Sequence, residues 1–113
     1  MSGCIFCKIV SGELPSQKLY EDDMILAFRD ITPQAPVHVL VIPKEHIQSA
    51  DDITADNSHV IGHIFAAIPQ IMRAEGVTNG YRVITNCGAD AGQAVGHLHF
   101  HCMAGRKLGL HLC

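Results

Sequence analysis

The stretch Gly96-His97-Leu98-His99-Phe100-His101-Cys102 places three histidines at alternate positions of an apolar run. Because successive side chains of a β-strand point to opposite faces, this alternation predicts a strand whose imidazoles project from one face at intervals of roughly 7 Å. Leu98, Phe100 and Cys102 would then face a core on the other side. Imidazole changes charge near neutral pH and serves as nucleophile or metal ligand, so this run is where we expect chemistry.

The composition is that of one globular domain covering residues 1–113. Hydrophobic residues make up 48% of the chain and charged residues 17%, as in folded proteins rather than disordered ones. A net charge of −3 argues against a broad nucleic-acid footprint, although local donors can still bind a small anion. The longest apolar runs, such as 37–43, are too short to cross a bilayer. We therefore expect neither a nucleic-acid partner nor a membrane partner.

The N-terminus and the cysteines indicate a cytoplasmic protein. Residues 1–4 contain neither the basic nor the apolar region of a signal peptide. Five cysteines in a chain that is not exported are expected to be free thiols or metal ligands rather than disulfides.

The hydrophobic pattern predicts an α+β fold. Apolar residues at helical spacing predict one long helix, capped by Asp56 or Asn57 and running to about Glu75 before Gly76. A shorter helix is expected over 5–10. The expected strands are 19–21, 24–28, 37–42, 81–85 and the histidine run. Short connections between strands favour antiparallel pairing.

A glycine-rich loop, residues 86–93, leads directly into the histidines. Gly88 and Gly92 permit positive φ, so successive backbone N–H groups can converge on an anion, and Asn86 and Gln93 add side-chain amides. Such a stretch is more often an ordinary hairpin loop. Its position beside three histidines favours a phosphate site.

The central histidine is the best candidate nucleophile. A neutral histidine attacks phosphorus through one ring nitrogen if a fixed acceptor holds the other as N–H. His99 lies between two histidines that could donate hydrogen bonds to phosphate oxygens. Two other interpretations are a strand whose histidines merely face solvent and a zinc site built from histidines alone.

The remaining cysteines and histidines are less specific. Cys4-x-x-Cys7 forms half of a tetrahedral zinc site, or two small buried side chains. Taken alone, His46 is typical of a surface loop and His38 of a packed strand. His59 and His63 are spaced i, i+4 on the long helix, a pattern typical of a solvated helix face.

Taken together, these motifs resemble the histidine triad (HIT) family. Residues 97–103 match its His-φ-His-φ-His-φ-φ motif, and co-linear matches extend over nearly the whole chain. The other matching stretches are Cys4-Ile5-Phe6-Cys7-Lys8-Ile9-Val10, Glu13-Leu14-Pro15, Ala27-Phe28-Arg29-Asp30-Ile31, Pro33-Gln34-Ala35-Pro36-Val37-His38, Val41-Ile42-Pro43-Lys44-Glu45-His46 and Gly92-Gln93. The chain looks like the bacterial form of the Hint branch, the purine nucleoside phosphoramidases.

The resemblance implies a homodimer in which two five-stranded antiparallel sheets join into one. It also implies hydrolysis of the P–N bond of AMP-type phosphoramidates through a nucleotidyl-histidine. By position, His99 would be the nucleophile and His101 a phosphate ligand. The other nucleotide-binding residues implied are Asn86, Gly92, Gln93 and Ala94 at the α-phosphate, Asp30 at the ribose, and Ile5, Phe6, Phe28 and Ile31 around the base. The zinc ligands implied are Cys4, Cys7, His46 and His97, one structural Zn²⁺ per chain.

Two features depart from the family pattern. Many Hint proteins have serine where this chain has Ala94, so a hydroxyl that would help to protonate the leaving group is absent. The tail 107–113 is short and apolar and lacks the tryptophan of some relatives. Three alternative functions stay open: a nucleotide-binding regulatory module with weak or no catalysis, a hydrolase of dinucleoside polyphosphates, and a zinc-dependent hydrolase.

Overall fold

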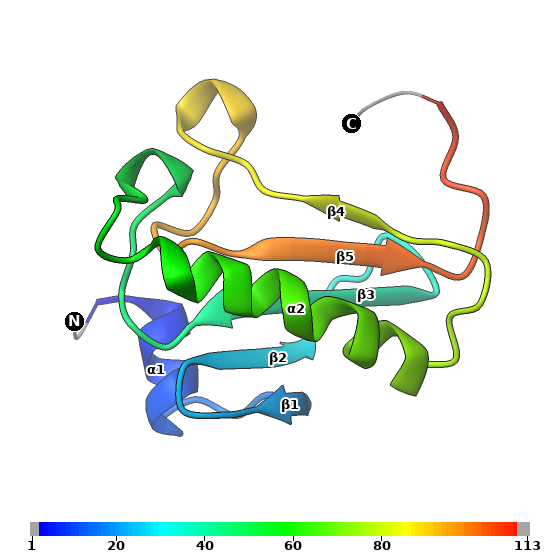
Figure 1. Cartoon of the computed structure of the whole chain (residues 1–113), viewed down its shortest axis with the longest axis horizontal. Helices are drawn as coiled ribbons and strands as arrows, with labels where there is room; N and C mark the ends of the chain where they lie inside the picture. The colour runs from blue at the N-terminus through cyan, green and yellow to red at the C-terminus, as the bar shows by residue number, and fades with distance from the viewer. Residues whose placement is uncertain (1–2, 111–113) are drawn as a thin grey trace.

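The fold is one five-stranded antiparallel sheet with a helix on each face. The computed structural model describes residues 3–110. The elements in chain order are α1 (Ile5–Ser11), β1 (Lys18–Glu21), β2 (Ile25–Arg29), β3 (Val37–Pro43), η1 (Ala50–Asp52), α2 (Ser58–Ala74), β4 (Arg82–Ile84), η2 (Ala89–Ala91) and β5 (Phe100–Ala104). The sheet order is β1-β2-β3-β5-β4, with every pairing antiparallel (Figure 1). The expected α+β class, its five strands and its two helices are confirmed.

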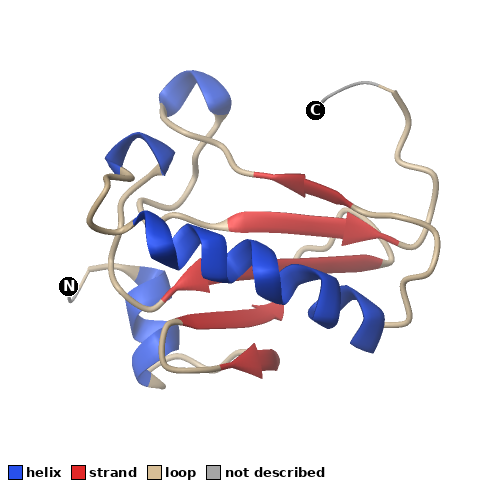
Figure 2. Cartoon of the chain, in the orientation of Figure 1, coloured by secondary structure: helices blue, strands red, loops and turns tan. Residues whose placement is uncertain are grey.

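The two faces of the sheet bury separate clusters of side chains. α2 lies across β2 and β3 on one face (Figure 2). Its apolar stripe packs there on alternate residues of the strands, including Ile25, Val39 and Val41. The other residues of β2 and β3, such as Leu40, pack against Phe6 of α1 on the opposite face. Because both faces are covered, β2 and β3 are hydrophobic almost throughout, as expected for strands buried on two sides.

Both helices end where the sequence indicates. Gly12 follows α1 with φ 85° and its N–H donates to the Ile9 carbonyl, a left-handed glycine cap. Gly76 follows α2 with φ 81°. At the start of α1, the Cys4 sulfur accepts a hydrogen bond from the Cys7 N–H at 3.3 Å. The N-terminal cap of this helix is therefore one of the two cysteines singled out above.

The histidine strand is shorter than the alternation predicts. β5 begins only at Phe100, and residues 97–99 lie outside the sheet ladder. The reason lies in the neighbouring strand: β3 ends at Pro43, which has no N–H to donate. The Leu98 N–H bonds instead to the carbonyl of Ile47, beyond the end of β3, at 2.6 Å. The strand prediction was therefore wrong for residues 97–99.

The predicted division of side chains between two faces is nevertheless confirmed. Leu98, Phe100 and Cys102 are buried in the cluster under α2. The rings of His97 and His99 lie against Phe6 of α1, which belongs to the opposite cluster. Among residues 3–110, no helix is long and apolar enough to span a membrane. Residues 111–113, the end of the apolar tail considered above, lie outside the described residues.

Candidate functional site

The histidines of the run lie between α1 and the start of β5. The ring centroid of Phe6 is 5.9 Å from that of His97 and 5.1 Å from that of His99, both edge to face. His97 is fully buried and His99 only 6% exposed. The rings of His99 and His101 are in turn 5.1 Å apart. The structure thus brings the three histidines together in a row beneath the N-terminal helix.

Hydrogen bonding fixes the tautomer of His99. Its Nδ1 lies 2.7 Å from the backbone oxygen of His97. A carbonyl oxygen only accepts, so Nδ1 must carry the proton and the neutral ring has its lone pair on Nε2. The arrangement meets the condition stated above for a nucleophilic histidine.

His101 belongs to a second group of polar side chains. Its Nδ1 lies 2.9 Å from Nε2 of His38, which is also 3.4 Å from the Asp30 carboxylate. The Nδ1 of His38 accepts the backbone N–H of Gln34 at 3.0 Å. Burial lowers the pKa of both His38 and His101, and Asp30 only partly opposes this effect. Both rings are therefore biased toward the neutral form.

His38 was expected only to pack, and the structure places it in the site as well. It is buried, as expected, but both of its ring nitrogens make polar contacts. The signal in the sequence was its position on the strand two residues before Leu40, on the face that the histidine row shares. In the sheet, His38 pairs with Met103 and Leu40 with His101, so His38 and His101 are diagonal neighbours.

The Gln93 side chain holds the loop 86–93 in place. The Gln93 side chain accepts the Gly88 N–H and donates to the carbonyls of Gln48 and Val95 at 2.8 and 3.0 Å. Its amide therefore organises the loop instead of standing free as an anion donor. The Gly92 N–H is also used within the loop. Within residues 3–110, by contrast, the Asn86 side chain has no hydrogen-bond partner and is free to donate.

The apolar residues assigned to the base divide into buried and exposed pairs. Phe6 and Phe28 are buried and touch edge to face, with ring centroids 5.6 Å apart. Ile5 is 52% exposed and Ile31 is 96% exposed. Asp30, next to Ile31, accepts the Thr32 N–H at 2.8 Å. Two large apolar side chains thus stand uncovered, one next to Phe6 in the sequence and the other three residues after Phe28, which suits a surface that a planar ligand would cover.

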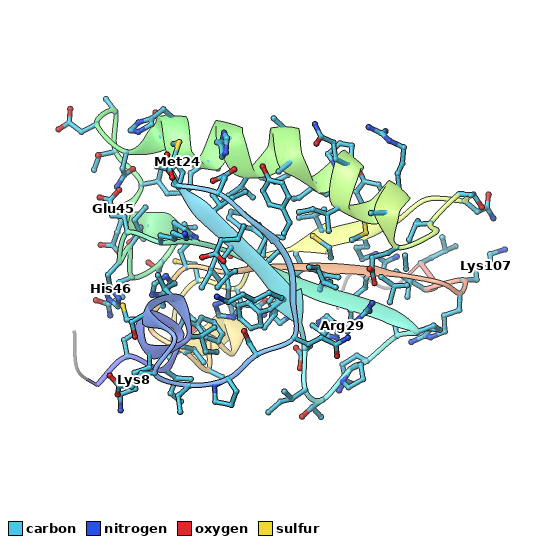
Figure 3. All side chains as sticks on the ribbon, turned by 90° about the horizontal axis from the view of Figure 1, so that it is seen from below. Lys8, Met24, Arg29, Glu45, His46 and Lys107 are labelled. Atoms are coloured by element: carbon cyan, nitrogen blue, oxygen red, sulfur yellow. The ribbon has the colours of Figure 1, made fainter. Side chains whose placement is uncertain are left out.

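The two cysteines, His46 and His97 form a compact cluster of four potential metal ligands. Their ligand atoms all lie within 4.8 Å of one another. Cys4 Sγ is 3.3 Å from Nδ1 of His97, and Cys7 Sγ is 3.3 Å from Nδ1 of His46 and 3.6 Å from Nδ1 of His97. His46 lies beside α1 in the side-chain view (Figure 3).

This donor set fits a tetrahedral zinc ion. When zinc–sulfur and zinc–nitrogen bonds have their usual lengths, a sulfur ligand and a nitrogen ligand of one tetrahedral zinc lie roughly 3.5 Å apart. The separations in the cluster are close to this value. The Nε2–H of buried His97 donates to the Pro43 carbonyl at 2.8 Å. That bond leaves the Nδ1 lone pair facing the thiols, as in metal sites whose histidines are oriented by a second hydrogen bond.

A second cluster, Asp30, His38 and His101, also has its ligand atoms within 4.8 Å of one another. It does not suit a metal. His38 Nδ1 already accepts the Gln34 N–H, so the neutral ring carries its proton on Nε2, the atom that would have to bind the ion. We therefore interpret this cluster as a hydrogen-bonded chain.

The fold and the site define an α+β protein whose buried histidine row suits nucleophilic attack on a bound anion. A family model described as "Scavenger mRNA decapping enzyme C-term binding" matches residues 3–110. The chain is 48% identical over 104 residues to an uncharacterized HIT-like protein of Synechococcus elongatus, covering 92% of this chain and 91% of that one. It is 42% identical over 106 residues to the purine nucleoside phosphoramidase of Escherichia coli, covering 93% and 89%.

Solved structures agree with these relatives. A histidine triad protein from Clostridium difficile superposes with a TM-score of 0.95 at 49% identity, covering 98% of this chain and 97% of the other. A HIT family hydrolase from Clostridium thermocellum superposes with a TM-score of 0.97 at 45% identity, covering 100% and 99%. The chain belongs to the histidine triad (HIT) family, as the resemblance predicted.

Proposed function

We propose that this protein hydrolyses the P–N bond of purine nucleoside 5′-phosphoramidates through a covalent nucleotidyl-histidine. The observation that carries the proposal is the 2.7 Å hydrogen bond from His99 Nδ1 to the His97 carbonyl, which leaves the Nε2 lone pair available. The 42% sequence identity to a purine nucleoside phosphoramidase supports the choice of substrate class.

The reaction proceeds in two displacements at phosphorus. His99 Nε2 attacks, a new N–P bond forms, and the substrate's P–N bond breaks as the amine leaves with a proton taken from solvent water. Water then attacks the phosphorus, His99 leaves, and the nucleoside monophosphate is released. His101 and Asn86 donate hydrogen bonds to the phosphate oxygens in this scheme. Asp30 binds the ribose, while Phe6, Phe28 and the exposed isoleucines Ile5 and Ile31 enclose the base.

The experiment that tests this proposal looks for the intermediate directly. The protein is mixed with an adenosine 5′-phosphoramidate of a primary amine, quenched in the steady state and measured by intact mass. The expected result is an added mass of AMP less water, mapped to His99 by peptide sequencing and absent from His99→Ala. Hydrolysis at an undiminished rate in His99→Ala, or an adduct on another residue, would refute the mechanism.

Ala94 favours one alternative substrate class. An amine leaves poorly without a proton donor, whereas a nucleoside polyphosphate leaves as a stable anion. The missing hydroxyl at position 94 should therefore slow cleavage of dinucleoside polyphosphates less than cleavage of phosphoramidates. A comparison of kcat/KM for the two substrate classes decides between them. If AMP binds and neither class is cleaved, the protein is a nucleotide-binding regulatory module.

We also propose that the cysteine–histidine cluster holds one structural zinc ion. Two thiolates and two imidazoles at the separations given above support this assignment. Bound zinc would cross-link α1 to the histidine segment, and with four protein ligands it would have no open position for water. This makes a zinc-dependent hydrolysis the weaker proposal. Among the described residues, Cys4, Cys7, Cys87 and Cys102 form no disulfide, which suits the proposed cytoplasmic location.

We further propose that the protein is a homodimer formed through the β4 edge. β4 is the last strand of the sheet, and an open edge presents unpaired backbone groups that a second copy can pair. Near this edge, Phe65 is 48% exposed and packs against Phe100 of the neighbouring β5, and Tyr81 is 41% exposed. Light scattering should give twice the 12.2 kDa chain mass. A Val83→Pro substitution on the edge should yield monomer.

A further inference from the structure

The tautomer of His101 can be deduced from its neighbours. The backbone N–H of Gln34 can only donate, so His38 accepts it on Nδ1 and carries its own proton on Nε2. A protonated His38 cation is excluded by the same contact, since two donors would then face each other at 3.0 Å. His38 Nε2–H therefore points to His101 Nδ1 at 2.9 Å, the nearer of its two acceptors.

It follows that His101 accepts on Nδ1 and carries its proton on Nε2. His99 has the opposite tautomer, with its proton on Nδ1. Adjacent rings of the row thus present different groups: His99 a lone pair for attack, and His101 an N–H for a phosphate oxygen. If His38 were in the other tautomer, His101 would have to donate from Nδ1. Its Nε2 would then present a lone pair to the anion, which repels it.

Gln34, whose N–H fixes this pattern, is itself held through its carbonyl by the turn after β5. Arg106 Nη2 donates to the Gln34 carbonyl at 2.9 Å. Gly105, with φ 98°, lies so close to the same loop that an added Cβ would be 2.8 Å from Cβ of Pro36. Both contacts join residues that immediately follow the strand of His101 to the loop that precedes the strand of His38.

We propose that the Gly105–Arg106 turn is a positioning device for phosphate recognition. By clamping the backbone of Gln34 at its carbonyl, it keeps the Gln34 N–H on His38 Nδ1 and thus keeps His38 and His101 in the tautomer that donates from Nε2. The phosphate role of His101 rests on the proposed function, but the hydrogen-bond chain does not. Arg106 acts through Gln34 and His38, with no need to touch the substrate.

Nitrogen NMR of the free protein tests the chain without any substrate. Two-bond ¹H–¹⁵N correlations of the imidazole rings distinguish protonated from unprotonated nitrogens. In the unaltered protein, His38 and His101 should be protonated on Nε2 and His99 on Nδ1. Protonation of His101 on Nδ1 would overturn the proposal.

Variants of the turn then test the clamp. In Arg106→Ala, exchange of the Gln34 amide should accelerate by about threefold to tenfold, the effect of losing one hydrogen bond. The nitrogen shifts of His101 should move toward values averaged over both tautomers. Gly105→Ala should produce the same changes by displacing Pro36 while Arg106 is intact. Lys107→Ala, which removes a neighbouring charge, is the matched control and should change neither signal.

Activity provides the second measurement. Arg106→Ala should lower kcat/KM for the phosphoramidate by about threefold to tenfold, and Arg106→Lys should restore it because an ammonium group can donate to the same carbonyl. Unchanged imidazole and amide signals in both Arg106→Ala and Gly105→Ala would refute the clamp, whatever the activity. If no phosphoramidate or dinucleotide is cleaved but the NMR changes occur, the clamp stands and only the proposed reaction fails.

Discussion

His97 donates nothing to His99 through its ring, yet its backbone oxygen accepts the His99 Nδ1–H at 2.7 Å. The same residue donates Nε2–H to the Pro43 carbonyl and turns Nδ1 toward the sulfur of Cys4 at 3.3 Å. One buried residue therefore joins the cysteine cluster to the candidate nucleophile. Any substitution that displaces His97 should therefore also allow His99 to exchange between its two tautomers.

Removing one cysteine should unload the metal and destabilise the fold. Cys4→Ser is expected to purify without the one equivalent of zinc that we expect in the unaltered protein. Its thermal midpoint should fall by about 10 °C, the shift that roughly 2 kcal/mol produces in a domain of this size. Metal analysis and thermal unfolding give the two readings. Cys87→Ser, at an exposed thiol outside the cluster, is the control and should keep both values.

Replacing the nucleophile should separate binding from chemistry. His99→Ala leaves the His97 carbonyl and the Asn86 side chain in place, so AMP should bind within a few-fold of its usual affinity. The hydrolysis rate should fall on the order of 10⁴-fold or more, as when other covalent catalysts lose their nucleophile. Calorimetry measures the first quantity and a coupled amine assay the second. His59→Ala, an exposed histidine on α2, should leave both unchanged.

The fold could be predicted from the sequence because apolar residues recur at clear strand and helix spacings. Alternation marked the faces of β5, and the stripe of α2 and its terminal glycine marked the long helix. The sequence could not show where the histidine strand begins, because that depends on Pro43 ending the ladder of the neighbouring strand. The start of β5 is thus set by a residue that is distant in the sequence.

The candidate site was accessible from the sequence only in part. Motif matches singled out His99 and the four residues of the cysteine cluster. The fold brings the ligand atoms of that cluster within 4.8 Å of one another. His38 was missed as a polar member because its contacts with Gln34 and His101 arise from strand register and a loop. Arg106 was missed for the same reason, since a single arginine after a strand has no pattern of its own.

Restoring a hydroxyl at position 94 should raise turnover. Ala94 is exposed and lies three residues before His97, so a serine side chain fits without repacking. If the hydroxyl helps to protonate the departing amine, kcat in Ala94→Ser should rise about tenfold or more for a basic alkylamine leaving group. The gain should be smaller for an aniline, which leaves more easily. Equal gains for the two leaving groups would mean that the serine acts on binding instead.

The last prediction concerns the turn between β1 and β2. Asp22 accepts hydrogen bonds from the Tyr20 hydroxyl at 2.7 Å and from His63 of α2 at 2.6 Å. Its other oxygen accepts the N–H groups of Met24 and Ile25. Burial acts to raise the pKa of Asp22, but these four hydrogen bonds outweigh it and hold the pKa well below its usual range. His63, expected on a solvated helix face, thus ties α2 to this turn.

Stability should therefore depend on pH through this carboxylate. A group whose pKa is lower in the folded state stabilises the fold fully above its unfolded pKa, about 3.9 for aspartate. That contribution is lost as the pH falls below this value toward the folded pKa. Asp22→Asn should lower the urea midpoint at pH 6 and flatten its decline between pH 5 and pH 2.5. Asp23→Asn, at the exposed neighbouring residue, controls for the loss of one carboxylate. If the two variants decline in parallel, the hydrogen-bonded Asp22 carboxylate contributes no measurable pH-dependent stability.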